Sequence, residues 1–215
     1  MDYSVIHLGG AKLIGIVDAA LVTNIIASHP GPLVLVVSAL DGTASALAAA
    51  AEGGPSAAIA GCSEPGRRAA ARGAAQAHRR ERLASLLYEK HLAFLVALAP
   101  EPGEMRRSCE MLAETRDELA RLLGGLRLAA HRRERLLKLG ERLLAICVAA
   151  AFSRVGRKAI LVESEELGRA LGEAEGAGGM ESALPAIRAG LRGHSAAVIP
   201  EYYVRVSGRQ AARVE

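Results

Sequence analysis

The chain alternates between short hydrophobic runs and longer stretches in which apolar positions recur with helical spacing. Ser4–Leu8 and Leu33–Val37 are the first two short runs, and the second (LVLVV) is typical of a strand covered on both faces. Between them, residues 12–28 have helical spacing and end at His29-Pro30-Gly31-Pro32. A strand, a helix and a strand in this order predict a βαβ unit with parallel strands and a right-handed crossover.

The rest of the pattern predicts mainly helices, separated by glycine and proline. Helices are expected over 43–52, 67–98, 105–123, 132–154 and 181–192. Short buried strands are expected over 159–162 and 196–199, with an edge-like strand over Tyr202–Val206. We therefore predict an α/β fold of three layers, α/β/α, with a mostly parallel central sheet. Helices 67–98 and 105–123 would form an added helical layer.

Composition narrows the class of protein. The 215 residues are 51% hydrophobic and 23% charged, which suits one globular domain. Aromatic residues make up only 3%, and this disfavours carbohydrate grooves, aromatic cages and base-stacking surfaces. The net charge of +4 is mild, so it permits phosphate-bearing partners without requiring them.

Cysteine and histidine spacing does not indicate a metal site. Cys62, Cys109 and Cys147 are far apart and form no CxxC pair, which favours a reducing compartment over a disulfide framework or structural zinc. Cys147 falls on an apolar helix face and is expected in the core. Surface or capping positions are expected for His78, His91, His131 and His194. No signal peptide and no apolar stretch long enough to span a bilayer is found, so we expect a cytoplasmic protein.

The first candidate for chemistry is the turn that follows the first strand. Gly9 and Gly10 stand between this strand and the next helix, where backbone N–H groups can approach a phosphate. A tight turn explains the two glycines equally well, and no GxGxxG motif is present.

The second candidate follows the strand over 33–37. Ser38 and Thr43 offer hydroxyl groups and Asp41 offers a carboxylate, at the sheet edge where open α/β sheets bind ligands. Alternatively, Asp41 or Thr43 serves only to cap the following helix. The pattern alone does not separate these two interpretations.

The third candidate is Gly140-Glu141 inside the helix over 132–154. A glycine in a helix costs about 1 kcal/mol relative to alanine, so we expect another part of the chain to approach closely there. Glu141 would then lie beside a small gap and could receive an ammonium group. The alternative is a solvated glutamate on an Arg/Glu-rich helix.

In order and approximate spacing, these stretches resemble the aspartokinases of the amino acid kinase superfamily. That family has a Lys-Phe-Gly-Gly-Thr-Ser strand end, a Val-Val-Ser-Ala segment, a long helical insert, a Gly-Glu-Arg-Leu-Ser helix and Asp-Ala-Arg-Glu-Leu and Asp-Gly-Arg turns. The segments that match are His7–Lys12, Val36–Leu47, Gly140–Leu144, Glu163–Leu167, Ala197–Pro200 and Gly208-Arg209.

The resemblance implies ATP-dependent phosphorylation of the L-aspartate side chain, with ATP and Mg²⁺ as cofactors. Ser38, Thr43 and Glu141 would bind the amino acid, with Glu141 recognising it. Gly9 and Gly10 would bind phosphate. His7 occupies the position of the family lysine that contacts the transferring phosphoryl group, and Lys12 could reach that phosphate from the helix start.

The chain departs from the family at several positions. His7 replaces the lysine, Ala11 and Lys12 replace Thr-Ser, and Ala44 and Ser45 replace Thr-Asn. Residues 1–215 would form a single amino acid kinase-like domain with a helical insert at about 67–125, and the family's nucleotide-binding half and ACT domains would be absent. We therefore expect an aspartokinase-like protein that is impaired or inactive on its own.

Two alternatives come from other classes. The chain could be a non-catalytic partner or regulatory subunit of another amino acid kinase, and either a homodimer or such a complex is expected. It could also be a nucleic-acid-binding module, which the mild charge and scarce aromatic residues disfavour. The basic residues concerned are Arg67, Arg68, Arg72, Arg79, Arg80 and Arg82.

Overall fold

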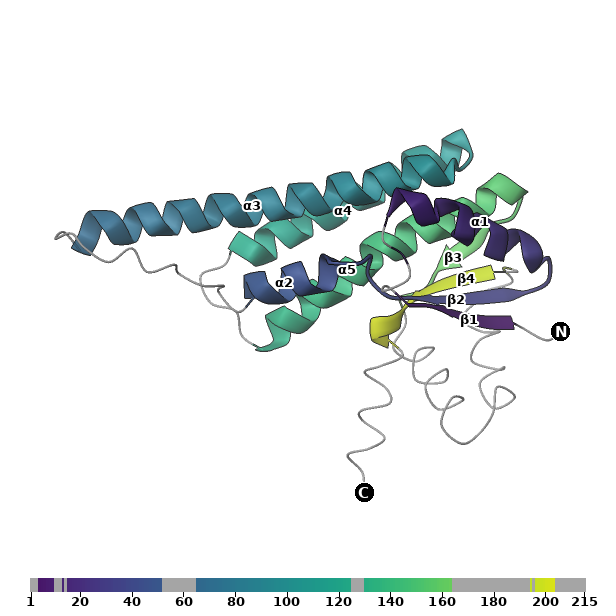
Figure 1. Ribbon diagram of the computed structural model, residues 1–215, viewed down its shortest axis with the longest axis horizontal. Coiled ribbons are helices and arrows are strands. Elements are labelled where there is room, and N and C mark those ends of the chain that lie inside the picture. The colour runs from purple at the N-terminus through teal and green to yellow at the C-terminus, as the bar shows by residue number, and fades with distance from the viewer. Residues whose placement is uncertain are drawn as a thin grey trace, which may run out of the picture.

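The computed structural model describes residues 4–9, 13, 15–51, 65–124, 130–163, 194 and 196–203, and within the helices it leaves the side chains of 65–77 and 130–132 undescribed. The elements run along the chain as shown in Figure 1. They are β1 (Ser4–Leu8), η2 (Ile16–Asp18), α1 (Ala19–Ser28), β2 (Leu33–Val37), α2 (Thr43–Ala51), α3 (Pro65–Leu98), α4 (Pro102–Gly124), α5 (Ala130–Ala151), η3 (Phe152–Val155), β3 (Ala159–Leu161) and β4 (Ala196–Pro200).

The four strands of the described residues form one parallel sheet in the order β1-β2-β4-β3. Leu33 of β2 pairs with Ser4 on one side and with Ala196 on the other, and Ala196 also pairs with Ala159. Every residue of the two central strands, β2 and β4, is buried. Continuous apolar runs are required where a strand is covered on both faces. The predicted α/β class with a mostly parallel sheet is therefore confirmed.

Successive residues of each strand point to opposite faces of the sheet. Leu8, Leu35 and Val198 share one face and belong to the main hydrophobic core beneath the helices. Val36 and Ile199 lie on the opposite face and are buried as well. The helix expected over 181–192 lies outside the described residues.

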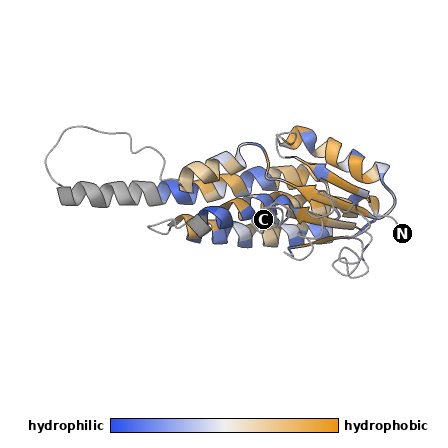
Figure 2. Cartoon of the chain, turned by 90° about the horizontal axis from the view of Figure 1, so that it is seen from below, coloured by the Kyte–Doolittle hydropathy of each residue, from blue (hydrophilic) through white to orange (hydrophobic). Residues whose placement is uncertain are grey.

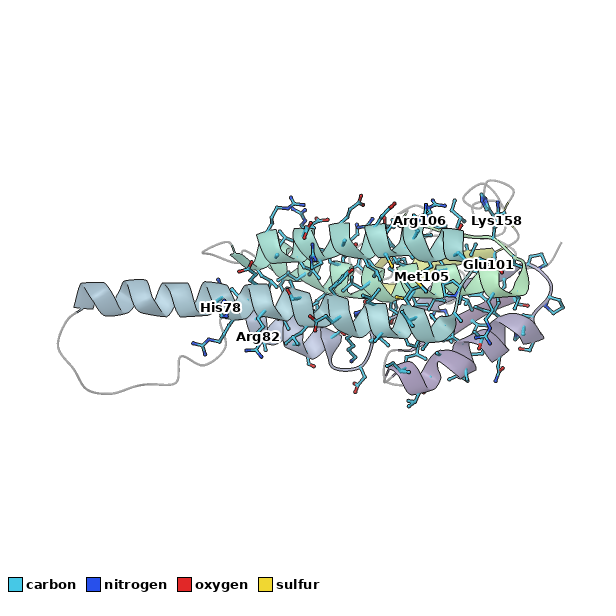
Figure 3. The ribbon with its side chains drawn as sticks, turned by 90° about the horizontal axis from the view of Figure 1, so that it is seen from above. His78, Arg82, Glu101, Met105, Arg106 and Lys158 are labelled. Atoms are coloured by element: carbon cyan, nitrogen blue, oxygen red, sulfur yellow. The ribbon has the colours of Figure 1, made fainter. Side chains whose placement is uncertain are left out.

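Helix α5 packs across the core face of the sheet and contacts β2, β3 and β4. Helices α3 and α4 pack on each other and on α5, which makes the helical layer expected from the sequence (Figure 1). The colours of Figure 2 show why the helices cover the sheet. The strands are almost wholly hydrophobic, while the helices carry hydrophilic residues on their outer sides. At its N-terminal end α3 projects beyond the other helices, and His78 and Arg82 point away from the body there (Figure 3).

Two predicted elements differ in the structure. The helix expected over 12–28 is the 3-10 turn η2 followed by α1. Gly15 has a backbone conformation far from helical, so a regular helix cannot begin before it, and its N–H donates to the Asp18 carboxylate (3.2 Å). The edge-like strand expected from Tyr202 is also wrong at its start, because 201–203 form a helical turn. The rest of that segment lies outside the described residues.

His91 corrects the expectation that it lies at the surface or caps a helix. It is fully buried in α3, and its ring Nδ1 lies 2.7 Å from the Leu87 carbonyl oxygen. Because a carbonyl can only accept, Nδ1 carries the proton and Nε2 is the acceptor nitrogen. Burial, more than the nearby Lys90 charge, lowers the pKa of His91 to about 4. Cys147 of α5 lies in the core as predicted, with its thiol 3.4 Å from the His91 carbonyl oxygen.

Candidate functional site

The carboxyl ends of β1, β2 and β4 meet at one edge of the sheet. Ser38, the first residue after β2, donates its backbone N–H to the carbonyl of Leu8, the last residue of β1 (3.2 Å). Gly9 follows Leu8 directly, and Val37 pairs with Pro200 at the end of β4. This is the edge at which open parallel sheets bind ligands, because loops diverge there and leave backbone groups exposed.

Ser38 and Glu141 both contact the dipeptide that follows β4. The Ser38 hydroxyl donates to the Glu201 carboxylate, and the backbone N–H of Tyr202 donates to the Glu141 carboxylate. A loop after β2, a helix and the turn after β4 are thereby joined at one point. The structure thus places two of the predicted site residues together, through two partners that the sequence analysis did not include in the site.

Gly140 shows how α5 reaches this edge. A Cβ atom at Gly140 would lie 2.8 Å from Leu47 Cδ1 and 3.2 Å from Thr43 Cγ2. The expected close approach to Gly140 is therefore confirmed, and the element that approaches is α2 rather than a strand end. Since a side chain here would push α2 away, the glycine permits the packing that holds Glu141 beside Ser38.

Glu141 is buried, with only 3% of its surface exposed, so it is not the solvated helix residue of the alternative interpretation. A buried carboxylate requires hydrogen-bond donors or a positive partner to offset its loss of hydration. Glu141 and Glu201 bring two carboxyl groups to the same edge. That arrangement suits a ligand group that is positively charged and rich in N–H donors, such as the ammonium of an amino acid.

Thr43 and Asp41 have different environments. Thr43 is fully buried, and its Oγ1 has no hydrogen-bond partner among the residues that the structure describes. Asp41 is exposed in a turn, where its N–H donates to the Leu13 carbonyl (3.0 Å) and its carbonyl accepts from Lys90 Nζ (2.5 Å). Gly42 follows with a φ of +75°, a conformation that favours glycine. Of these two residues, Thr43 therefore packs against α5, whereas Asp41 is exposed.

Arg142 anchors the helix that carries Glu141. Its Nη1 donates to Thr115 Oγ1 of α4 (2.9 Å), and its Nε lies 2.8 Å from Glu163 Oε1 just beyond β3. These contacts tie α5 to α4 and to the residues just beyond β3. The arginine of the Gly-Glu-Arg-Leu stretch therefore positions the neighbouring glutamate.

The phosphate side of the predicted site is only partly described. His7 pairs with Val36, so it belongs to the face opposite α5, and its side chain is exposed. Gly9 is exposed at the strand end, with open space where a Cβ would be. Gly10 and Lys12 lie outside the described residues. The structure therefore does not bring His7 together with Glu141 on one face.

The described residues contain no cluster of metal-ligating side chains. No group of three or more His, Cys, Asp or Glu side chains with metal-binding geometry occurs among them. Glu141 accepts a hydrogen bond from the Tyr202 N–H, and Glu201 accepts one from the Ser38 hydroxyl.

Glu201 and Tyr202 are the residues of this edge that sequence analysis missed. Tyr202 was assigned to an edge-like strand and Glu201 to no element, although a charged residue directly after a buried strand is itself a signal of the carboxyl edge. In the described part of the chain no helix combines the length and hydrophobicity needed to cross a membrane.

Comparison with solved structures shows that the fold is aspartokinase-like. The structure is similar to E. coli aspartokinase III in complex with lysine and aspartate (T-state), with a TM-score of 0.59 and 16% sequence identity. It is also similar to E. coli aspartokinase III in complex with aspartate and ADP (R-state), with a TM-score of 0.52 and 17% identity.

These matches cover 91% and 92% of this chain and 40% of each aspartokinase chain, so the chain spans about two fifths of the length of the structures it resembles. No protein-family model matches the sequence, and no curated protein matches it. At such low identity the likeness is one of fold.

Proposed function

We propose that this chain is an aspartokinase-like protein whose carboxyl sheet edge binds an amino acid, with L-aspartate as the ligand. Glu141 receives the α-ammonium group, and the hydroxyl groups of Ser38 and Thr43 supply polar contacts beside it. The observation that carries the proposal is the convergence of Ser38 and Glu141 on Glu201-Tyr202. The fold supports it, since the similar aspartokinase III structures hold aspartate.

Charge complementarity gives the mechanism of recognition. Glu141 is buried and already accepts the Tyr202 N–H, so its orientation is set before a ligand arrives. An ammonium placed there gains charge-assisted hydrogen bonds in surroundings with little water. Thr43 Oγ1 is buried without a partner among the described residues, so a polar ligand atom would satisfy a group that is now unsatisfied.

We further propose that phosphoryl transfer by the 215-residue chain is weak. Catalysis of this reaction depends on charge placed around the moving phosphoryl group. By resemblance, His7 stands where the family has lysine, and an imidazole carries less positive charge near neutral pH than an ammonium. Ala44 and Ser45 also replace the family's Thr-Asn pair.

Calorimetric titration with L-aspartate tests the proposal. Wild type is expected to bind, and Glu141→Gln is expected to bind at least about tenfold more weakly, since it removes one charge-assisted contact. Glu134→Gln is the matched control, because Glu134 is an exposed glutamate of the same helix. Equal affinity in Glu141→Gln and wild type would overturn the assignment of this residue, and no binding by wild type would overturn the proposed ligand.

A further inference from the structure

A pocket lies on the side of α5 that packs against α4. It has a volume of about 320 Å³ and is open between α4, α5 and the residues just beyond β3 and β4. Its charged and aromatic lining residues are Glu118, Arg135, Lys138, Arg142, Glu163 and Tyr203. Neither Ser38 nor Glu141 lines it, so it is separate from the amino acid site proposed above.

The pocket contains one positive charge more than its carboxylates neutralise. Arg135 pairs with Glu118 of α4 (2.9 Å), and Arg142 pairs with Glu163 (2.8 Å). The Arg142 Nε is buried, and its N–H is not aligned with any acceptor of the described residues, although the Glu163 oxygen is near. Both guanidinium groups are thus held by carboxylates, which leaves Lys138 as the one cation of this lining that no carboxylate neutralises.

Lys138 supplies the excess charge. Its Nζ lies 4.3 Å from the ring centre of Tyr203 and 5.7 Å from that of Tyr202. Within the described part of the chain these rings are its partners, and no carboxylate pairs with it. A cation over an aromatic ring at a partly exposed site gains about 0.5–1 kcal/mol, which is less than a charge-assisted hydrogen bond provides. The Lys138 ammonium can therefore bind an anion in place of water while it stays in contact with the two tyrosine rings.

The spacing of three basic residues along α5 places their side chains on the same face of the helix. Arg135, Lys138 and Arg142 stand at positions i, i+3 and i+7, which fall on one face of a helix. The paired carboxylates come from the flanking elements and hold the two guanidinium groups at the sides of the pocket. Lys138 lies between them in sequence, over the tyrosine rings.

We propose that this pocket binds a small oxyanion, of the carboxylate or phosphate class, with Lys138 as the charge that receives it. Its size is at the lower end of the range for small-molecule sites, about 300–1,000 Å³, which fits an ion or a short organic acid. The proposal rests on this pocket alone and does not depend on aspartate binding at Glu141.

The test is calorimetric titration of the full chain with inorganic phosphate and, separately, with acetate, at constant ionic strength set by sodium chloride. At least one of the two oxyanions is expected to bind wild type, and the tighter one identifies the class. Lys138→Met keeps the aliphatic stem and removes the charge, so its affinity should fall at least about tenfold. Lys138→Arg keeps the charge and should bind within a few-fold of wild type.

A control variant separates this site from general charge. Lys158→Met removes an exposed lysine directly before β3 (labelled in Figure 3) that does not line the pocket, and it should leave oxyanion affinity unchanged. Equal affinity in Lys138→Met, or an equal loss in Lys158→Met, would overturn the proposal, as would failure of both oxyanions to bind wild type. If Lys138→Met does not fold, Lys138→Gln takes its place in the same comparison.

Discussion

Thr43 and Gly140 meet where α2 crosses α5, and a Cβ atom on Gly140 would lie 3.2 Å from Thr43 Cγ2. The contact places the residue after Gly140, Glu141, at the edge of the sheet, where Tyr202 donates to it. It also brings the buried Thr43 hydroxyl into the same region of α5. The candidate site therefore depends on a helix crossing as much as on the strand ends.

Gly140→Ala is expected to lower the free energy of unfolding by up to about 2 kcal/mol. Alanine favours the helical state by about 1 kcal/mol, but overpacking a full core typically costs about 1–3 kcal/mol. Leu47 Cδ1 would be only 2.8 Å away, and both Leu47 and Thr43 are fully buried and so have little room to move. Urea denaturation measures the effect.

The control for this substitution is Gly103→Ala. Gly103 is also a helical glycine, but nothing lies within 4 Å of the position of its Cβ. It should therefore be neutral or stabilising. If the two variants have the same stability, α2 does not pack against α5 as described.

His91 makes stability depend on pH. Its pKa is about 4 in the folded chain and 6.5 ordinarily, so below pH 6.5 the unfolded state takes up a proton that the native state does not. The contribution of neutral His91 to the free energy of unfolding is complete above pH 6.5. It falls by on the order of 3 kcal/mol as the pH falls toward 4. His91→Met should flatten the difference in stability between pH 7 and pH 4.5.

His78→Met is the matched control, because His78 is an exposed histidine of the same helix. Denaturant unfolding at several pH values should give it the slope of wild type. A wild-type slope in His91→Met would mean that His91 is not buried in its neutral form.

The Cys147 thiol should be unreactive in the folded protein. Burial, with a smaller contribution from Cys109, raises the pKa of Cys147, so the thiolate that reacts with disulfide reagents is scarce. Cys109 is only half-buried and should be modified faster. Mass spectrometry of peptides after timed treatment with a thiol reagent measures the ratio, and equal rates would contradict the buried position.

The 215-residue chain should show little aspartate-dependent ATP turnover, and His7→Lys alone should not restore a rate typical of kinases, about 1–100 s⁻¹. His7 lies on the face of the sheet opposite α5, so a longer cation there does not by itself complete a site around Glu141. A coupled assay for ADP release measures the rate. Turnover in that range by wild type would show that the departures from the family pattern are not limiting.

Much of the fold could be predicted from the sequence because strand signals here are local. The first two strands match their predicted bounds, Ser4–Leu8 and Leu33–Val37, since each is an apolar run with a clear breaker beside it. The burial of His91 could not be predicted, because it depends on which face of a long helix meets α5. That choice is made by packing between distant segments.

The sequence indicated which types of residue form the candidate site, but it could not show which segments contact one another there. Gly140 signalled a close approach, since glycine is unfavourable in a helix. That the approach comes from α2 depends on tertiary packing. The roles of Glu201 and Tyr202 could not be predicted, because the apolar and aromatic residues around them are typical of a strand. In the structure, residues 201–203 form a helical turn, and the Tyr202 N–H donates to the Glu141 carboxylate.

The most direct measurement of the central claim compares L-aspartate with succinate, which lacks the ammonium group, in wild type and in Glu141→Gln. If Glu141 binds the ammonium, wild type prefers aspartate by at least about tenfold, and Glu141→Gln loses most of that preference while its succinate affinity changes little. Calorimetric titration of the two ligands into the two proteins gives all four affinities. An undiminished preference for aspartate in Glu141→Gln would contradict the account.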